Sequence, residues 1–250
     1  ISAYGISRLR SISYMVDDMP EQSQVKKDLK FFEANFSGFL PLEMMVEFKT
    51  KKRRPVLDIK NLEKVEEFEN FLDSIPVMSK PLSVLSFIKA SKQAFYNGNP
   101  EKYSLPTKTE GAFILRYMKG QSDNSGLFKS FVDTTFSKMR ISCQIADIGS
   151  TRLDSLVHIM IEPRMKATFV STEKDTVITS ITGSTKIFIK GNKFLVANLQ
   201  ESLLLAFVLI TLSMAILFAN VRMIIISLIP NLLALMITAG LMGYFNIPLK

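Results

Sequence analysis

The chain has 250 residues but only one cysteine, one histidine and no tryptophan. A single cysteine, Cys143, cannot form a disulfide within the chain, so a fold held together by disulfides is excluded. It alternates with polar residues alongside Met139, Ile141 and Ile145, a pattern that predicts a buried strand residue rather than a reactive thiol. The single histidine, His158, has no second histidine or cysteine pair near it, so we expect no metal site.

Motifs of catalysis are also missing. The sequence contains no P-loop, no dinucleotide-binding fingerprint and no nucleophile elbow. The adjacent acids Asp17–Asp18 and Glu66–Glu67 are poor candidates for paired-carboxylate catalysis, because neighbouring residues on a helix point in different directions. We therefore expect no catalytic residue, no cofactor-binding residue and no enzymatic activity.

Charge is nearly absent from the C-terminal part of the chain. Between Ser202 and Leu249 the only charged residue is Arg222, although the whole chain carries 31 Lys and Arg and 23 Asp and Glu. Two apolar runs, Ser202–Ala219 and Met223–Tyr244, flank this arginine. As helices they would be about 27 and 33 Å long, enough to cross a hydrocarbon core of about 30 Å. We expect a transmembrane α-helical hairpin, and a helical hairpin buried in a soluble core is the disfavoured alternative.

Five residues of this hairpin have predicted roles. Arg222 in the tight turn favours a cytoplasmic turn, which leaves residues 1 to about 200 on the extracytoplasmic side. Pro230 removes a backbone hydrogen bond and Asn231 places an amide within the span, so a kink or a helix contact is expected there. Ala239 and Gly243 form a small-xxx-small pair that permits close helix packing. Because none of the last four is ionisable, packing is favoured over a direct role in a transport path.

The first 200 residues alternate between helical and strand periodicity, which predicts an α+β fold. Without a helical insertion at about 78–120, the order strand, helix, strand, strand, helix, strand is that of a ferredoxin-like (split βαβ) domain. Its two helices would cover one face of a four-stranded antiparallel sheet. The expected elements are an amphipathic helix over Pro20–Phe36, a strand over Leu42–Phe48, a helix capped by Asp58, strands over Leu127–Thr135 and Met139–Asp147, a helix after Thr151 that Pro163 should kink or restart, and a strand over Thr176–Thr182.

These patterns divide the chain into four parts. Residues 1–36 hold a leading segment and the amphipathic helix. The acidic pair Asp17–Asp18 precedes this helix and suits the positive end of its dipole. Residues 37–193 form the ferredoxin-like domain with its insertion. Residues 194–220 form a helix that leads into the first span, and residues 221–245 the second span. Since the chain begins without a targeting segment and stops directly after an apolar run, we expect a fragment of a longer membrane protein.

The net charge of +8 raises the question of an anionic partner. Only the cluster Lys49 and Lys51–Arg54 is dense enough to bind one, and it falls between a strand and a helix, where a solvated loop is the usual reason. No nucleic-acid motif or aromatic platform accompanies it. We therefore expect no nucleic-acid partner, with binding of anionic lipid or nucleic acid by this loop as the weaker alternative.

A sheet domain feeding directly into a membrane helix and a tight hairpin resembles the resistance-nodulation-division (RND) superfamily. The similarity is greatest to its MMPL and Patched-like (sterol-sensing-domain type) branch of predicted lipid exporters. Residues 80–119 match no pattern of that family. The stretches that carry the resemblance are Tyr14–Pro20, Asp28–Leu29, Phe36–Gly38, Ile181–Gly183 and Arg222–Gly243 with its Pro230–Asn231 pair.

The resemblance implies one repeat of a transporter driven by the proton motive force. The sheet domain would be its periplasmic porter domain, in a multi-pass protein of the cell inner (plasma) membrane. The partners implied are membrane lipids, a hydrophobic or amphiphilic cargo, further transmembrane helices and a second repeat of the same protein, with homo-oligomerisation left open. The family's proton-relay carboxylates lie on a later helix, which would begin after Lys250. Of the two repeats, the second is slightly favoured.

Two interpretations remain beside each other. The first is a transporter whose many Phe and Met residues line an adaptable apolar path, although their spacing favours ordinary core positions. The second is an extracytoplasmic sensor or binding domain anchored by the hairpin, with no transport activity. A soluble output domain after Lys250 would favour the sensor, and further apolar spans, one bearing acidic residues, would favour the transporter.

Overall fold

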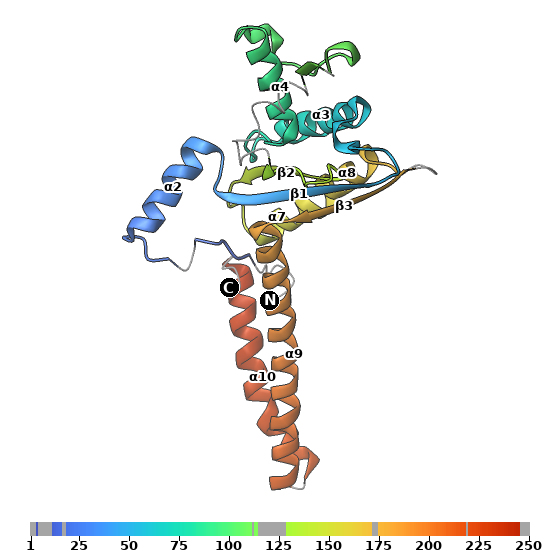
Figure 1. Ribbon diagram of the computed structural model, residues 1–250. Helices are drawn as coiled ribbons and strands as arrows, with labels where there is room; N and C mark the ends of the chain where they lie inside the picture. The colour runs from blue at the N-terminus through green and yellow to red at the C-terminus, as the bar shows by residue number, and fades with distance from the viewer. Residues whose placement is uncertain are drawn as a thin grey trace. The chain divides into compact units, whose positions relative to one another are not determined.

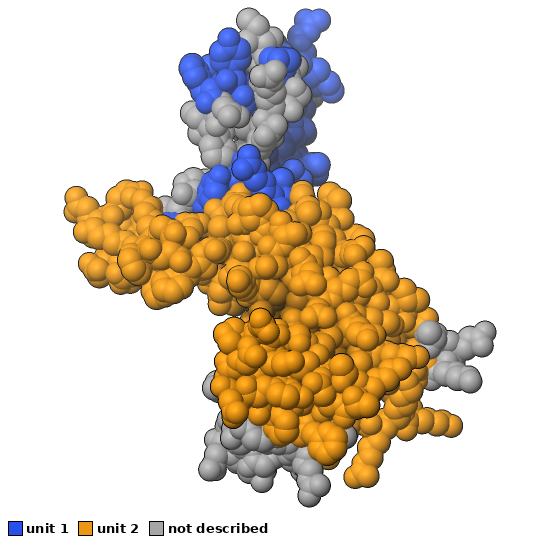
Figure 2. Space-filling model, turned by 90° about the horizontal axis from the view of Figure 1, so that it is seen from above, with its two compact units in different colours: residues 1–18, 149–152, 188–250 blue, residues 19–148, 153–187 orange. Residues whose placement is uncertain are grey.

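The computed structural model describes residues 4, 12–16, 19–111, 113–114, 129–171, 175–218 and 220–245. The chain forms two compact units, which are coloured separately in Figure 2. Unit 1 comprises residues 1–18, 149–152 and 188–250, and unit 2 comprises residues 19–148 and 153–187. The fold class is α+β, with a small antiparallel sheet in unit 2 and two long apolar helices at the C-terminal end (Figure 1).

The sheet of unit 2 has the strand order β2-β1-β3, and both pairings are antiparallel. The strands are β1 (Leu40–Lys49), β2 (Lys138–Ile145) and β3 (Thr176–Thr182). These confirm the strands predicted over Leu42–Phe48, Met139–Asp147 and Thr176–Thr182. Along β1 the apolar residues at alternate positions are buried, as a strand with one covered face requires.

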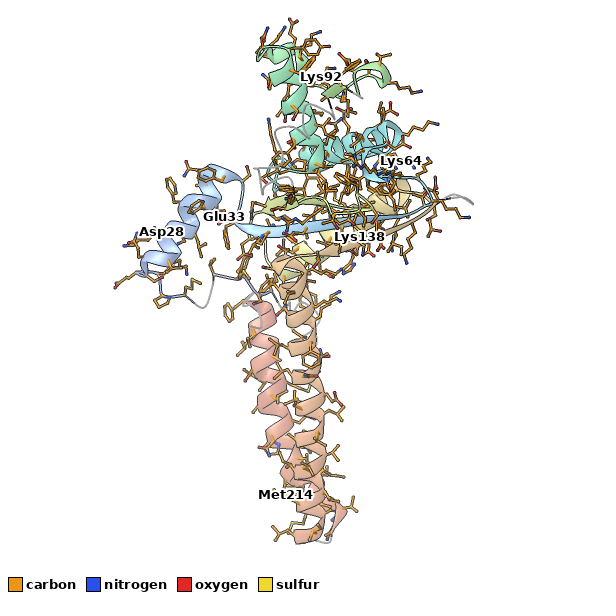
Figure 3. All side chains as sticks on the ribbon, viewed as in Figure 1. Asp28, Glu33, Lys64, Lys92, Lys138 and Met214 are labelled. Carbon is orange, nitrogen blue, oxygen red and sulfur yellow. The ribbon has the colours of Figure 1, made fainter. Side chains whose placement is uncertain are left out.

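The two faces of the sheet differ in chemistry. On the covered face, Met44 of β1 lies opposite Ile141 of β2 and Ile181 of β3. On the other face, Glu43 and Glu47 of β1 form ion pairs with Arg140 and Lys138 of β2, at 3.2 and 3.5 Å. Figure 3 labels Lys138 on this sheet. The polar face keeps the strand register fixed, since a one-residue slip would bury these charges.

Helix α3 (Ile59–Asp73) and the helical segment after β2 cover the sheet. The ring of Phe68 in α3 packs edge-on against Phe169, which follows α8 (Glu162–Thr168), with centroids 5.8 Å apart. Glu67 of α3 also pairs with Arg164 of α8 at 2.8 Å. The core of unit 2 includes the buried side chains of Leu42, Met44, Val46, Leu62, Val65, Phe68, Leu72, Ile141, Cys143, Ile145, Val157, Ile161 and Met165.

The effect of Pro163 is visible in the helix after β2. This segment begins as α7 (Ser150–Ser155), continues as the π-helical turn η3 (Leu156–Ile161) and ends as α8, with Pro163 in the first turn of α8. The Glu162 N–H donates to the carbonyl of Val157, five residues back. Because proline has no N–H, the ordinary hydrogen-bond ladder is interrupted at Pro163, and the chain stays helical there through a π-helical turn instead of restarting.

The outer edge of β2 is paired with a short extended segment, Val77–Leu82. Leu82 exchanges two backbone hydrogen bonds with Ser142, at 2.8 and 2.9 Å, and the Ser79 N–H donates to Gln144 at 2.9 Å. The isolated bridges in this segment are antiparallel to β2. The first residues of the predicted insertion therefore belong to the sheet.

The strand predicted over Leu127–Thr135 is wrong for its described part, residues 129–135. Only Val132 forms a bridge, to Met139. Asp133 explains why the chain turns instead: its carboxylate accepts the N–H groups of Ser137 and Lys138 at 2.8 and 2.7 Å. An aspartate that bonds the backbone a few residues ahead closes a loop, and this competes with strand extension.

The predicted insertion contains helix α4 (Val84–Phe95) and the 3-10 turn η2 (Pro100–Lys102). Lys92 anchors this insertion from α4, where Figure 3 labels it. Its ammonium is buried and bonds to Glu110 at 3.1 Å and to the carbonyl of Leu105 at 2.9 Å. Hydrogen bonds from the Thr107 backbone, Tyr96 and Lys92 lower the pKa of Glu110 to about 2. The lysine is thus fully paired, as a buried charge must be.

Helix α2 (Gln24–Phe36) confirms the predicted amphipathic helix. Ser23 caps its start by accepting the Lys26 N–H at 3.2 Å. The acidic pair predicted to start this helix, Asp17–Asp18, lies outside the described residues. The helix ends at Ser37, with φ of 61°, and Gly38, with φ of 130°, which a side chain could not occupy because a Cβ would lie 2.2 Å from the backbone of Ile145.

Helix α9 (Ser184–Phe218) starts directly after β3 and is unbroken over 35 residues. At its start, the Thr185 hydroxyl donates to the carbonyl of Pro41 at 2.8 Å. The division between the two units falls within this helix, between Ile187 and Phe188. Helix α10 (Val221–Tyr244) follows after a short break.

Candidate functional site

The apolar helices α9 and α10 are the main functional feature of unit 1. Both are long and apolar enough to cross a membrane, and their side chains are exposed along nearly the whole apolar length. Soluble proteins rarely expose contiguous apolar surface of this extent, so these helices favour association with a membrane. Two threonines within the apolar stretches bond to the backbone of their own helix: Thr211 donates to the carbonyl of Phe207 at 2.8 Å, and Thr238 to that of Ala234 at 2.9 Å. This internal pairing suits helices surrounded by hydrocarbon.

The turn between the two helices carries Arg222. Arg222 is the second residue of helix α10. The side chain of Asn220 caps this helix by accepting the Arg222 N–H at 3.0 Å. Arg222 is exposed. The capping contact was not predicted, although an asparagine directly before an apolar helix is a recognisable start signal.

The four other predicted residues of the hairpin divide into two groups. Pro230 and Asn231 are exposed, and α10 continues through them as one helix. Ala239 is half-buried and Gly243 is buried. The buried positions of α10 therefore lie near its C-terminal end. Gly240 is also buried there, although the small-xxx-small pattern did not include it. Its spacing of three from Gly243 is the signal that could have identified it.

A polar cluster in unit 1 joins three segments that are distant in sequence. The Ser150 hydroxyl accepts the Ser13 N–H at 3.1 Å and the Asn192 side-chain amide at 2.8 Å. The Ser150 N–H in turn donates to the carbonyl of Ser13 at 2.8 Å. The cluster Ser13–Ser150–Asn192 thus fastens the segment before α2 to α9. Its contacts join residues far apart in the sequence, so no local sequence pattern predicts them.

A glycine makes this cluster possible. Gly149 has φ of 84°, and a Cβ there would lie 2.8 Å from Ile12 and 3.2 Å from the Tyr14 ring. The residue before Ser150 must therefore lack a side chain, because the leading segment packs directly against its backbone.

Among the described acids of unit 2, Glu69 of α3 is the one whose pKa is clearly raised. Its carboxylate accepts a hydrogen bond from the Ser83 hydroxyl, which also caps α4 by accepting the Leu85 N–H at 3.0 Å. Burial raises the pKa of Glu69 to about 7, and the Ser83 hydrogen bond and the positive charge of Lys89 only partly oppose this. Glu66, which pairs with Lys89 at 2.7 Å, adds to the rise. The group therefore titrates near neutral pH.

The single histidine lies in a charged surface cluster. His158 Nδ1 is 2.7 Å from Glu162, and its Nε2 is 3.1 Å from Lys186 and 3.5 Å from Asp154. Hydrogen bonds from Lys166 and His158 lower the pKa of Glu162. Within the described residues, no group of three or more His, Cys, Asp or Glu side chains is arranged to hold a metal ion.

The sole cysteine, Cys143, is buried in β2, as predicted. Its thiol is 3% exposed, and burial raises its pKa to about 12. A thiol with so high a pKa is unreactive in the folded protein.

The basic cluster predicted as a solvated loop lies between β1 and α3. Lys51, Lys52 and Arg53 are exposed. Lys52 pairs with Asp58 and Asp175 at 3.3 and 3.6 Å, and both raise its pKa. These contacts within the chain account for part of the positive charge of the loop.

Comparisons with known proteins leave the chain without an assigned family: no protein-family model matches it, and a search of curated proteins returned no match.

Proposed function

We propose that this chain is part of an RND-type, MMPL-like transporter that uses the proton motive force to export a lipid or another hydrophobic or amphiphilic cargo. The observation that carries the proposal is the continuity of α9. The helix begins at the end of β3 and continues without a break into an exposed apolar stretch. A rigid helix shared by a sheet domain and a membrane span is suited to passing movement from one to the other.

The order of elements in unit 2 supports a ferredoxin-like porter domain. With Val77–Leu82 counted as the edge strand, the chain order is β1, α3, edge strand, β2, the helix of α7 to α8, and β3. The spatial order of the strands is then edge strand, β2, β1, β3. A split βαβ domain has this order, with two helices on one face of an antiparallel sheet.

The topology we propose places unit 2 outside the cytoplasm and the turn at Arg222 inside it. A single arginine in a short turn favours the cytoplasm, whereas a long domain is translocated regardless of its charge. Because the chain has one cysteine, and that one is buried, introduced cysteines report sidedness cleanly. In a Cys143→Ala background, Lys60→Cys should react with an impermeant maleimide in intact cells. Val221→Cys should react only after permeabilisation, and the reverse pattern would refute this topology.

Energy coupling requires parts beyond the described helices. A proton relay in a membrane uses ionisable side chains within the spans. The apolar stretches of α9 and α10 contain none, since Arg222 lies in the turn. The proposed transporter therefore needs further membrane helices, including one with acidic residues, and a second repeat of the same protein as partner.

The export of lipid is tested with the full-length protein. Mass spectrometry of lipids that co-purify in a gentle detergent should find a specific lipid class enriched over the bulk membrane. A strain without the gene should accumulate that class in the inner leaflet or lose it from the outer envelope. A protein that carries no specific lipid, together with an unchanged envelope, would refute lipid export. A soluble output domain after residue 250 would instead support the anchored sensor.

A further inference from the structure

The amphipathic helix α2 carries an apolar stripe that is largely exposed among the residues the structure describes. Val25, Phe32 and Phe36 lie on one side of the helix and are 57%, 49% and 56% exposed. Leu29, on the same side, is half-buried, and Phe31, farther round the helix, is 59% exposed. The rings of Phe32 and Phe36 contact each other, with centroids 5.3 Å apart. We call these residues, Val25, Leu29, Phe32 and Phe36, the α2 stripe.

The hydrogen bonds of α2 that reach other described segments are polar contacts outside this stripe: Lys26 bonds the segment just before the helix, and Glu33 bonds the backbone at Asp147. Lys26 is 6% exposed and bonds to the Met19 carbonyl at 3.1 Å and to Glu21 at 2.8 Å. Glu33 accepts the Asp147 N–H at 2.9 Å. Figure 3 labels Glu33 on α2. The arrangement is the reverse of an ordinary surface helix, which buries its apolar face and exposes its charges.

The chain between Ser13 and α2 is long enough to permit α2 to reach a bilayer surface. In unit 1, Ser13 is fastened through Ser150 to Asn192 of α9. The apolar stretch of α9 begins at Ser202, about 15 Å further along the helix. Twelve residues link Ser13 to Val25, a chain that spans at most about 40 Å. The tether is therefore longer than the distance from the Ser13–Ser150–Asn192 cluster to the start of the membrane span.

We propose that α2 lies on the bilayer surface on the side where α9 enters it, with the α2 stripe at the boundary between lipid headgroups and acyl chains. This rests on the proposed membrane insertion of α9 and α10. A helix with phenylalanines along one side and charges on the other is the type that lies in this boundary.

A second copy of the chain fits the stripe less well than lipid does. The exposed apolar area of the α2 stripe together with Phe31 is about 400 Å². That is about half of the roughly 800 Å² that each partner contributes to a stable interface. The acidic residues Asp28 and Glu33 flank the stripe, so binding rests on apolar burial and does not require anionic lipid.

The absence of tryptophan makes a direct test possible, because one introduced tryptophan is the only such reporter in the chain. Phe32→Trp places it in the stripe, and Ala34→Trp places it at an exposed position on the opposite side of the same helix. Leu233→Trp, in the middle of α10, reports insertion of the hairpin. Each variant is placed in phosphatidylcholine nanodiscs whose acyl chains carry bromine either near the headgroup or near the bilayer centre.

The proposal expects three results together. Phe32→Trp should emit at shorter wavelength than Ala34→Trp and lose most of its emission to bromine near the headgroup. Ala34→Trp should keep its emission with both lipids, and Leu233→Trp should be quenched by bromine near the bilayer centre. The quenching of Phe32→Trp should be unchanged by high salt.

The possible failures are distinguishable. If Leu233→Trp is quenched and Phe32→Trp is not, the hairpin is in the bilayer and the assignment of α2 is overturned. A short-wavelength emission of Phe32→Trp that persists in detergent without bromine quenching would place the stripe against protein. If that emission depended on protein concentration, the protein would be a second copy. If Leu233→Trp is not quenched, the membrane insertion itself fails.

Discussion

The buried acid Glu69 should make unit 2 less stable as the pH rises through neutrality. Its pKa is about 7 in the folded chain, against 4.5 for an exposed glutamate. Between pH 4.5 and pH 7, the carboxyl group of Glu69 is therefore protonated in the folded state and ionised in the unfolded state. Stability from this group is fully present below about pH 4.5 and falls as the pH approaches the folded pKa near 7.

The size of the effect follows from the shift. A difference of about 2.5 pKa units, at 1.36 kcal/mol each, corresponds to about 3 kcal/mol of unfolding free energy between pH 4 and pH 8. Glu69→Gln removes the titration and keeps a carbonyl that can accept the Ser83 hydrogen bond. The variant should match the natural chain near pH 4.5 and be more stable than it by up to about 3 kcal/mol near pH 8. Such a gain is large beside a typical domain stability of 5–15 kcal/mol.

The buried Cys143 supplies the assay. The full chain in detergent is incubated in increasing urea at each pH and then exposed briefly to a dithiodipyridine reagent, which labels thiols in acidic as well as neutral solution. Labelling reports unfolding of the sheet, because the thiol is 3% exposed when folded. Glu63→Gln is the matched control on the same helix, since the side chain of Glu63 is exposed. The control should change stability by less than about 1 kcal/mol.

A pH-independent difference between Glu69→Gln and the natural chain would refute the reasoning. So would a variant that loses stability at high pH as steeply as the natural chain. Either result would mean that the pKa of Glu69 is not raised in the folded state.

Two further predictions use the same thiol assay. Gly183 has φ of 99° and a Cβ there would lie 2.8 Å from the Pro41 carbonyl, so Gly183→Ala should destabilise unit 2 by about 2–3 kcal/mol. Gly98 has φ of 79°, but a Cβ there would meet nothing within 4 Å, so Gly98→Ala should lower the unfolding free energy by only about 1 kcal/mol. Equal losses in the two variants would contradict a role for the close contact between position 183 and Pro41. Asp133→Ala should lower the unfolding free energy by about 1–2 kcal/mol, because it removes the acceptor of two backbone N–H groups. Asp133→Asn keeps an acceptor oxygen and should lose at most half as much. Equal losses in both variants would argue against the turn.

Periodicity in the sequence predicts the three strands of the sheet and the helices α2 and α3. The alternation around Met44 and around Cys143 predicted β1 and β2, and Asp58 correctly marked the start of α3, where it accepts the Lys60 N–H at 3.2 Å. These predictions succeed because the side chains in question sit on one face of an element and the core selects them locally.

The edge strand was misplaced because two segments competed for one position. Residues 127–135 contain more strand-forming residues than Val77–Leu82, yet the carboxylate of Asp133 closes a turn there. The segment Val77–Leu82 comes three residues after α3 and pairs with β2 mainly through backbone hydrogen bonds, to which the Ser79 hydroxyl adds one by accepting the Gln144 N–H. Pairing through the backbone leaves little trace in the side-chain pattern, so it could not be predicted.

The polar cluster Ser13–Ser150–Asn192 and the pair Glu69–Ser83 were also missed. Each joins residues from different segments, and each member taken alone is an ordinary polar residue. The roles predicted for Pro230, Asn231, Ala239 and Gly243 were drawn from local chemistry and remain predictions about partners in the membrane.

In the proposed transporter, the unbroken course of α9 would let it act as a lever arm. Its sheet end is held at Thr185, bonded to Pro41, and its 35 residues extend about 52 Å. A rotation of about 5° at the held end would move the other end by about 4–5 Å, close to the rise of one helical turn. The one glycine in α9, Gly191, lies near the held end, where extra bending has the largest effect on the far end. Replacing it would therefore change the stiffness of the lever more than its length.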